Sequence, residues 1–280
     1  MELLAVENLC KKYETFALKN VSFTLDQGYI MGFIGRNGAG KTTTLKSMLN
    51  LVHADSGNVN VFGENFTKNE LKLKQKIALM LGGVAYYPKN KVGTIAGVVK
   101  RFYDEWDDAV FAKYLKRFDL NPAKKVDELS AGMKIKFALA LALSHNAKLL
   151  ILDEPTSGLD PVSRDDLLEL FQELIEEGDK SILFSTQITS DLEKCADFIT
   201  YIRNGEIVTS TNKDDFLNSY KIVKGTSEQF AEAKGKLVGY KKNAFGFSGL
   251  AKTADLPAGL EMDAADIESI MIYFEREMRE

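Results

Sequence analysis

The chain has 280 residues, of which 45% are hydrophobic and 27% are charged, and its formal net charge is −4. This balance is typical of a folded globular protein and excludes an extended disordered chain. The weakly acidic charge also disfavours a dedicated nucleic-acid binder, which would carry a strongly basic face, so no nucleic-acid partner is expected.

Two observations bear on the compartment of the chain. Cys10 and Cys195 lie in no Cys-x-x-Cys motif, which predicts free thiols in a reducing compartment. The N-terminus has no signal-peptide pattern, and the apolar runs are too short to cross a bilayer. We therefore expect a soluble, cytoplasmic chain that reaches a membrane only through a partner.

Strands and helices are predicted to alternate along residues 1–215. Tyr29 to Ile34 is a nearly continuous apolar run, as in a parallel strand that is covered on both faces. The pair Asn204-Gly205 predicts a tight hairpin turn. Residues 41–50 and 163–177 are predicted helices, and residues 68–146 a helical subdomain. The other predicted strands are 3–9, 20–25, 58–63, 149–152, 181–185, 198–203 and 206–210.

The pattern changes near residue 215, which predicts a small C-terminal α+β domain over residues 216–280. Its last segment carries apolar residues at the i, i+3, i+4, i+7 spacing of an amphipathic helix, namely Ile267, Ile270, Met271 and Phe274. The fold class is therefore α/β, with a mixed sheet and an antiparallel part.

A phosphate-binding loop follows the apolar run that ends at Ile34. Its residues match the pattern G-x-x-x-x-G-K-[ST] and precede a predicted helix. Glycines let backbone N–H groups wrap phosphates, and the helix N-terminus adds a positive dipole end. A lysine then contacts the β- and γ-phosphates, and a threonine hydroxyl serves Mg²⁺. The candidate nucleotide-binding residues are Gly35, Arg36, Asn37, Gly38, Ala39, Gly40, Lys41, Thr42 and Thr43.

Two carboxylates end the buried run Leu149 to Leu152. Asp153 is placed to hold Mg²⁺ together with Thr42, and Glu154 is placed to orient or deprotonate the attacking water. Ligands of open α/β sheets bind outside such strand ends. A strand that merely ends in surface acids is the alternative, and the preceding phosphate loop disfavours it.

With Leu129-Ser130-Ala131-Gly132-Met133 and Ser157-Gly158-Leu159-Asp160, these motifs make residues 1–215 resemble the ATP-binding cassette (ABC) family. The resemblance implies an exporter-type nucleotide-binding subunit. It also implies a head-to-tail dimer in which Ser130 and Gly132 of one subunit contact the ATP of the other. Tyr13 matches the aromatic that stacks on adenine, with ordinary packing as the alternative, and Asp160 matches the loop that couples the two sites, while also serving as a helix cap.

Four positions depart from the family pattern. Residues 129–133 match the signature motif of the family, in which Ala131 and Met133 replace the usual Gly and Gln. Gly82 stands where the family has a glutamine that reaches the Mg²⁺ site. Gln187 replaces a histidine that contacts the γ-phosphate; an amide still donates a hydrogen bond but carries no charge. Both changes predict retained ATP binding with slower turnover. The histidines, His53 and His145, are expected on the surface.

The resemblance implies an ATPase subunit of a transporter, peripheral to the membrane, in a homodimer or heterodimer with separate permease subunits. Its docking region is expected between Gly82 and Trp106, where Tyr86, Tyr87, Phe102 and Tyr103 form either an apolar patch or a subdomain core. Two alternatives remain. One is a soluble cassette ATPase that acts on a non-membrane assembly, and the other is an ATP-sensing switch with weak hydrolysis.

Overall fold

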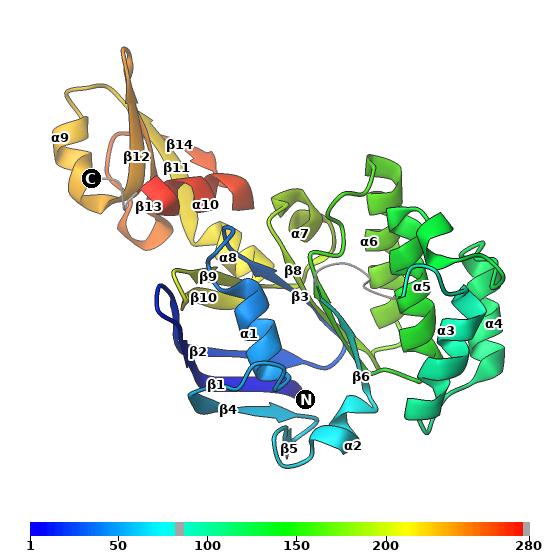
Figure 1. Ribbon diagram of the computed structural model, residues 1–280. Coiled ribbons are helices and arrows are strands. Elements are labelled where there is room, and N and C mark those ends of the chain that lie inside the picture. Colours follow the sequence, from blue (N-terminus) through cyan, green and yellow to red (C-terminus); the bar gives the residue numbers. More distant parts are fainter. Residues whose placement is uncertain (82–86, 277–280) are drawn as a thin grey trace. The chain divides into compact units, whose positions relative to one another are not determined.

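The computed structural model describes residues 1–81 and 87–276. The chain forms two compact units, which are described separately (Figure 1). The N-terminal unit comprises residues 1–187 and 195–210, and the C-terminal unit comprises residues 188–194 and 211–280. Cys10 and Cys195 are in no disulfide. Among the helices of the described residues, none combines the length and apolar character needed to cross a bilayer.

The N-terminal unit contains two sheets. The first is antiparallel, with strand order β2-β1-β4-β5, and the second has the order β10-β9-β3-β8-β7-β6. In the second sheet, β9, β3, β8, β7 and β6 run parallel. The bounds are β1 Glu2–Lys12, β2 Ala17–Asp26, β3 Ile30–Ile34, β4 Ser56–Val61, β5 Glu64–Asn65, β6 Ile77–Met80, β7 Leu149–Asp153, β8 Ser181–Thr186, β9 Phe198–Arg203 and β10 Glu206–Asn212.

Burial along the strands follows the sequence pattern. Every residue of β3 is buried, as predicted for a strand covered on both faces. In β2, burial alternates at Val21, Phe23 and Leu25, because only one face of the antiparallel sheet meets the core. Helix α1 (Lys41–Met48) contacts β1, β2 and β7 between the two sheets, and α6 (Pro161–Ile175) packs on β3 and β8 (Figure 1).

The helical region between β4 and β7 is organised around α5 (Ala131–Ser144), which contacts α3, α4 and β6. Side-chain caps fix two helix starts. The Asp107 carboxylate accepts hydrogen bonds from the backbone N–H groups of Ala109 and Val110, and the Ser130 hydroxyl accepts one from the backbone N–H of Met133. The predicted helical subdomain therefore also contains the strand β6. The remaining bounds are α2 Glu70–Lys74, α3 Val92–Val99, η1 Lys100–Phe102, α4 Asp108–Arg117 and η2 Val126–Glu128.

The C-terminal unit is built on an antiparallel sheet with the order β12-β13-β11-β14, and α10 packs on β12 and β13. The predicted amphipathic helix is confirmed, since Ile267, Ile270 and Phe274 are buried. The bounds are α7 Thr189–Cys195, α8 Lys213–Asn218, β11 Tyr220–Gly225, α9 Phe230–Ala233, η3 Lys234–Lys236, β12 Leu237–Asn243, β13 Gly246–Lys252, η4 Thr253–Asp255, β14 Glu261–Ala264 and α10 Ile267–Arg276.

The hairpin of β9 and β10 turns at Asn204-Gly205, as predicted, and the turn supports the loop before α1. Gly205 has φ +79°, its N–H donates to the carbonyl of Ala39 at 2.9 Å, and its carbonyl accepts from Lys19 N at 2.8 Å. A Cβ at Gly205 would lie 1.8 Å from the carbonyl oxygen of Ala17. Only glycine satisfies both the positive φ and this close approach.

The variant Gly205→Ala is expected to destabilise the N-terminal unit by about 3 kcal/mol, of which about 1 is positive-φ strain and about 2 is steric overlap. Gly63→Ala is the matched control, because Gly63 has φ +77° and a Cβ there meets no atom within 4 Å. We expect the control to be destabilised by the strain alone, by about 1 kcal/mol. Urea unfolding followed by the fluorescence of Trp106, the single tryptophan, measures both; equal losses would contradict the overlap.

Candidate functional site

The predicted phosphate loop connects β3 to α1. Gly38 and Gly40 have φ values of +82° and +116°, which side chains rarely tolerate. A Cβ at Gly40 would also lie within 3 Å of Leu18 and Phe16. Gly40 caps α1 without a side chain, so the N–H groups of the first helical turn face the loop. The whole predicted set, Gly35 to Thr43, thus lies on one loop and one helix start.

The side chain of Lys41 is buried and points back across the loop. Its Nζ donates to the carbonyl of Gly35 at 2.7 Å and to that of Arg36 at 3.5 Å. It also pairs with the Glu154 carboxylate at 3.4 Å, with only 6% of the Lys41 side chain exposed. The ammonium is therefore held inside the curve of the loop, where a phosphate would meet it.

Asp153 joins three segments of the site. One of its carboxylate oxygens accepts a hydrogen bond from the Thr42 hydroxyl at 2.7 Å, and the other accepts a hydrogen bond from the Ser185 hydroxyl. Ser185 Oγ in turn accepts the backbone N–H of Glu154 at 3.2 Å. The aspartate is buried, and these charge-assisted bonds satisfy its two oxygens. The contacts fix the start of α1 against the ends of β7 and β8.

Glu154 is the strained and incompletely paired member of the cluster. Its φ is +51°, which is unusual for a residue other than glycine. Its Oε1 faces Lys41, whereas the buried Oε2 has no hydrogen-bond partner among the described residues. Burial raises the pKa of the Glu154 carboxyl, and this outweighs the opposing effect of the Lys41 ammonium. Such a group is a candidate proton acceptor.

Gln187 directly follows β8 and is exposed. Its backbone N–H lowers the pKa of the Glu154 carboxyl, against the larger effect of burial. Because β3, β7 and β8 are parallel neighbours, their carboxyl ends meet at one edge of the sheet. The structure thus brings together the phosphate loop, both acids and Gln187.

The donor set fits a magnesium ion that is shared with phosphates. The oxygens of Thr42 and Asp153 are hard donors 2.7 Å apart, the kind that Mg²⁺ prefers. Within the described part of the chain, no group of three or more His, Cys, Asp or Glu side chains could hold a metal. Mg²⁺ commonly takes only one or two protein ligands and completes its shell with phosphate oxygens and water.

The predicted signature lies elsewhere in the N-terminal unit. Ser130 caps α5 and Gly132 lies in its first turn, where a Cβ would be 3.6 Å from Ser163. Asp160 caps α6: its carboxylate accepts hydrogen bonds from the backbone N–H groups of Val162 and Ser163. Within one chain its contacts are therefore those of a helix cap. Figure 1 shows α5 among the peripheral helices, away from α1 and the phosphate loop. Within one chain, signature and loop are therefore on separate elements.

Tyr13 lies between β1 and β2 and is 44% exposed. The Lys11 ammonium lies 5.6 Å from its ring centroid. The ring is thus not part of the buried core. An exposed ring beside a cation is suited to stacking on a flat ligand.

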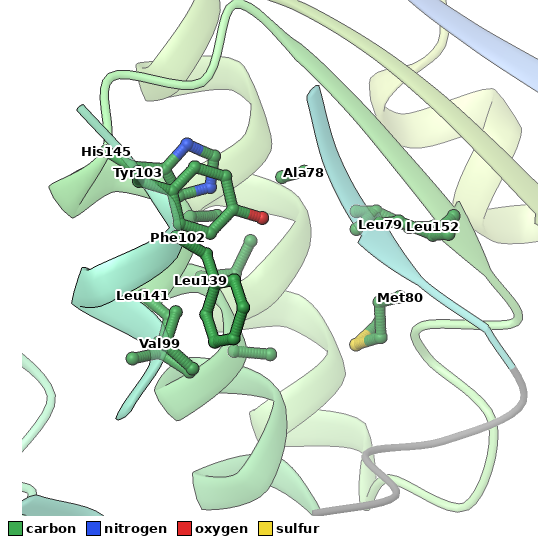
Figure 2. Close-up of a pocket in the computed structure, with 12 residues that line it drawn as sticks. Ala78, Leu79, Met80, Val99, Phe102, Tyr103, Leu139, Leu141, His145 and Leu152 are labelled. Carbon is green, nitrogen blue, oxygen red and sulfur yellow. The ribbon is translucent and has the colours of Figure 1, made fainter. Parts of the chain in front are cut away.

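A second hollow, of about 280 Å³, lies between β6 and the helices α3 and α5 (Figure 2). Met80 projects into it from β6, opposite Val99 and Phe102. Tyr103 and His145 line one side with rings stacked at 3.7 Å. The expectation of a surface His145 was wrong: it is buried, its Nδ1 lies 3.1 Å from the carbonyl of Gln75, and burial lowers its pKa.

Of the aromatic residues in the expected docking region, some are exposed, as in a surface patch, and others are partly buried, as in a subdomain core. Tyr87 and Phe102 are 79% and 70% exposed, whereas Tyr103 is partly buried against His145 and Trp106 is partly buried beside Phe111. His53 is exposed, as expected. Gly82 and Tyr86 lie outside the described residues.

Ser185 was missed by the sequence reasoning. It holds Asp153 in place, yet it had been treated only as the end of an apolar strand. A polar residue at the carboxyl end of a buried strand, beside the acidic strand, was the signal that could have found it. The Lys41–Glu154 pair was also not anticipated, because it joins residues that are far apart in the chain.

The fold and the cluster of loop, lysine and strand-end acids define a P-loop nucleotide-binding protein. Residues 18–157 match the family model described as ABC transporter. The chain is 32% identical over 203 residues to the ABC transporter ATP-binding protein YtrB of Bacillus subtilis, covering 72% of this chain and 69% of that protein. It is 33% identical to the bacitracin transport ATP-binding protein BcrA of Bacillus licheniformis, covering 74% and 68%.

Two further comparisons agree. The lantibiotic transport ATP-binding protein SrtF of Streptococcus pyogenes is 32% identical, with coverage of 76% of this chain and 92% of that protein. A solved structure of the ATP-binding subunit of an ABC transporter superposes with a TM-score of 0.69 at 28% identity, covering 76% of this chain and 91% of that one. The chain belongs to the ABC transporter family as a nucleotide-binding subunit, which confirms the predicted family and fold class.

The raised pKa of Glu154 makes a prediction for stability. Because folding raises this pKa above its ordinary value of 4.5, ionising the carboxyl weakens the folded state as the pH rises through the folded pKa. Glu154→Gln removes that cost. We expect the variant to unfold at higher urea than the wild type at pH 8, with an advantage that shrinks on acidification and vanishes below pH 4.5.

The control is Glu7→Gln, which removes an exposed carboxylate from β1 and is expected to change the urea midpoint little at any pH. An advantage of Glu154→Gln that stayed constant with pH would contradict the raised pKa of Glu154, and a loss at pH 8 would show that the Lys41 pair outweighs burial.

Proposed function

We propose that this chain hydrolyses ATP as the peripheral, cytoplasmic subunit of an exporter-type ABC transporter. Two copies, or this chain and a similar subunit, close head to tail on two Mg-ATP and drive separate integral membrane permeases. Family membership supports ATP binding and hydrolysis in general. The observation that carries the proposal for this chain is the convergence of Lys41, Thr42, Asp153 and Glu154 at one sheet edge.

Each residue of the cluster has a role in phosphoryl transfer. The loop N–H groups and Lys41 bind the β- and γ-phosphates, and Tyr13 stacks on adenine. Thr42 and Asp153 would hold Mg²⁺, which neutralises phosphate charge when bound. Glu154 accepts a proton from a water whose oxygen bonds to the γ-phosphorus while the bond to the ADP oxygen breaks. Its raised pKa and unpartnered oxygen suit a proton acceptor.

The division of the site between elements supports the proposed dimer. Ser130 and Gly132 open α5, where a hydroxyl and helix-end N–H groups can meet a γ-phosphate. Because α5 lies away from α1 within one chain, these groups serve the ATP of a second subunit. Asp160 begins the neighbouring helix α6 and couples the two sites. ATP then joins the subunits, and its hydrolysis releases them.

Permease docking is proposed at the hollow between β6 and the helices α3 and α5. Its lining is mostly apolar, and Phe102, at its edge, is 70% exposed, as a surface that receives a partner would be. The expected docking region, Gly82 to Trp106, contributes Val99, Phe102 and Tyr103 to this lining (Figure 2). Relatives named for bacitracin and lantibiotic transport support export of compounds of that kind.

An ATP-sensing switch is the second candidate, because Gln187 carries no charge and Gly82 offers no side-chain ligand. One assay separates the two functions. We expect the purified chain to hydrolyse ATP slowly, Glu154→Gln to lose about 100-fold or more in kcat, and Gln187→His to raise kcat several-fold, about 1 kcal/mol of barrier. The Gln187 amide can donate a hydrogen bond to phosphate but cannot become positively charged, so we expect the histidine variant to be faster.

Equilibrium ATP binding is the control, and both variants should retain it, because neither changes the loop. Hydrolysis by the wild type no faster than by Glu154→Gln would favour the sensor. An unchanged or lower rate for Gln187→His would refute the proposed effect of the amide at this position.

A further inference from the structure

The helix that follows Gln187 groups with the C-terminal unit. Residues 188–194 form one compact unit with residues 211–280, while Gln187 belongs to the N-terminal unit. The division therefore falls at the peptide bond between Gln187 and Ile188. Helix α7 begins two residues after Gln187. Ile188 alone separates α7 from Gln187 in the chain.

Glu193 ties α7 to two other elements of the C-terminal unit. Its Oε1 accepts the backbone N–H of Ile267, the first residue of α10, at 3.2 Å. Its backbone carbonyl accepts from the Nζ of Lys213, the first residue of α8, at 2.9 Å. A carboxylate at a helix N-terminus is favoured both by the hydrogen bond and by the helix dipole.

The partner helix is firmly held within its own unit. Asp266 caps α10 by accepting from Ser269 N at 2.7 Å, and Ile267 and Ile270 are fully buried. Helix α10 also packs on β12 and β13, and its Tyr273 hydroxyl lies 2.8 Å from Ser248 Oγ. On α7, Leu192 is fully buried. Glu193 thus connects α7 to a helix that is packed into the C-terminal unit.

We propose that Glu193 is a positioning residue for Gln187, and that through it the C-terminal unit forms part of the ATPase switch. This inference rests on the proposed function, in which Gln187 contacts the γ-phosphate. The backbone N–H of Gln187 also acts on the Glu154 carboxyl, whose pKa it lowers. The position of α7 therefore sets two contacts at once, one to the substrate and one to the proton acceptor.

This arrangement predicts which kinetic constant changes. The phosphate loop and Tyr13, which determine most of the ATP affinity, lie far from α7 in the sequence and do not depend on Glu193. Gln187 acts at the γ-phosphate, where charge rearranges during hydrolysis. Loss of the Glu193 bond should therefore lower kcat, and it should weaken ATP binding relative to ADP binding because only ATP carries the γ-phosphate.

The test uses three variants of the full chain. Glu193→Ala removes the acceptor, and we expect kcat to fall about threefold, as for a surface carboxylate at a helix N-terminus. Glu193→Gln keeps an acceptor oxygen and should recover at least half of the lost rate. Glu268→Ala is the matched control: it removes an exposed acid from the first turn of the same helix α10 and should match the wild type.

A double-mutant cycle separates positioning from a general effect on folding. In a Gln187→Ala background, Glu193→Ala should cause no further loss of kcat, because the residue it positions is gone. A threefold loss of kcat in both backgrounds would overturn the proposal.

Equilibrium binding of ATP and ADP gives a second readout that does not need turnover. Glu193→Ala should reduce the ratio of ATP to ADP affinity about threefold, and only when Gln187 is present. An unchanged ratio would overturn the proposal. Absence of hydrolysis by the wild type would instead count against the proposed function, while the affinity ratio still decides the role of Glu193.

Discussion

The buried carboxylate of Asp153 is the contact on which the rest of the site depends. It receives hydroxyl hydrogen bonds from Thr42 on α1 and Ser185 on β8, so one side chain joins three segments. A buried aspartate without such partners would be costly, and removing either hydroxyl would leave a charge less well satisfied. The same contacts place Thr42 beside the carboxylate, where the proposed Mg²⁺ would bind, and direct Glu154, the next residue, toward Lys41.

The fold makes this convergence possible through parallel pairing. Because β3, β7 and β8 are neighbours that run in one direction, the loop after β3, the acids after β7 and Gln187 after β8 share an edge. Glycines carry the positive φ angles of the loop, and Gly205 braces it from the adjacent hairpin. At the same edge, the backbone of Glu154 is strained by its positive φ angle. Backbone strain at Glu154, and a carboxylate oxygen without a hydrogen-bond partner among the described residues, are features expected of a reactive group.

Local patterns predicted most of the fold and the ligand-binding motifs, because they depend on neighbouring residues. The apolar run of β3, the Asn204-Gly205 turn and the period of α10 are of this kind. Ser185 and the Lys41–Glu154 pair needed tertiary proximity, which a single sequence does not contain. His145 was misplaced for the same reason: nothing local to it foretells stacking on Tyr103. The role of α7 was also hidden, since its partner Ile267 is 74 residues away.

Attachment to a membrane partner is the central claim, and purification of the tagged chain from its native membranes tests it most directly. We expect an integral membrane protein to be recovered with the chain in a fixed ratio. Phe102→Ser should reduce that recovery, because it removes the exposed ring beside the docking hollow, whereas Phe245→Ser, which removes an exposed ring of the C-terminal unit, should not. Recovery with ribosomes or another soluble assembly, and no integral membrane protein, would contradict a transporter subunit.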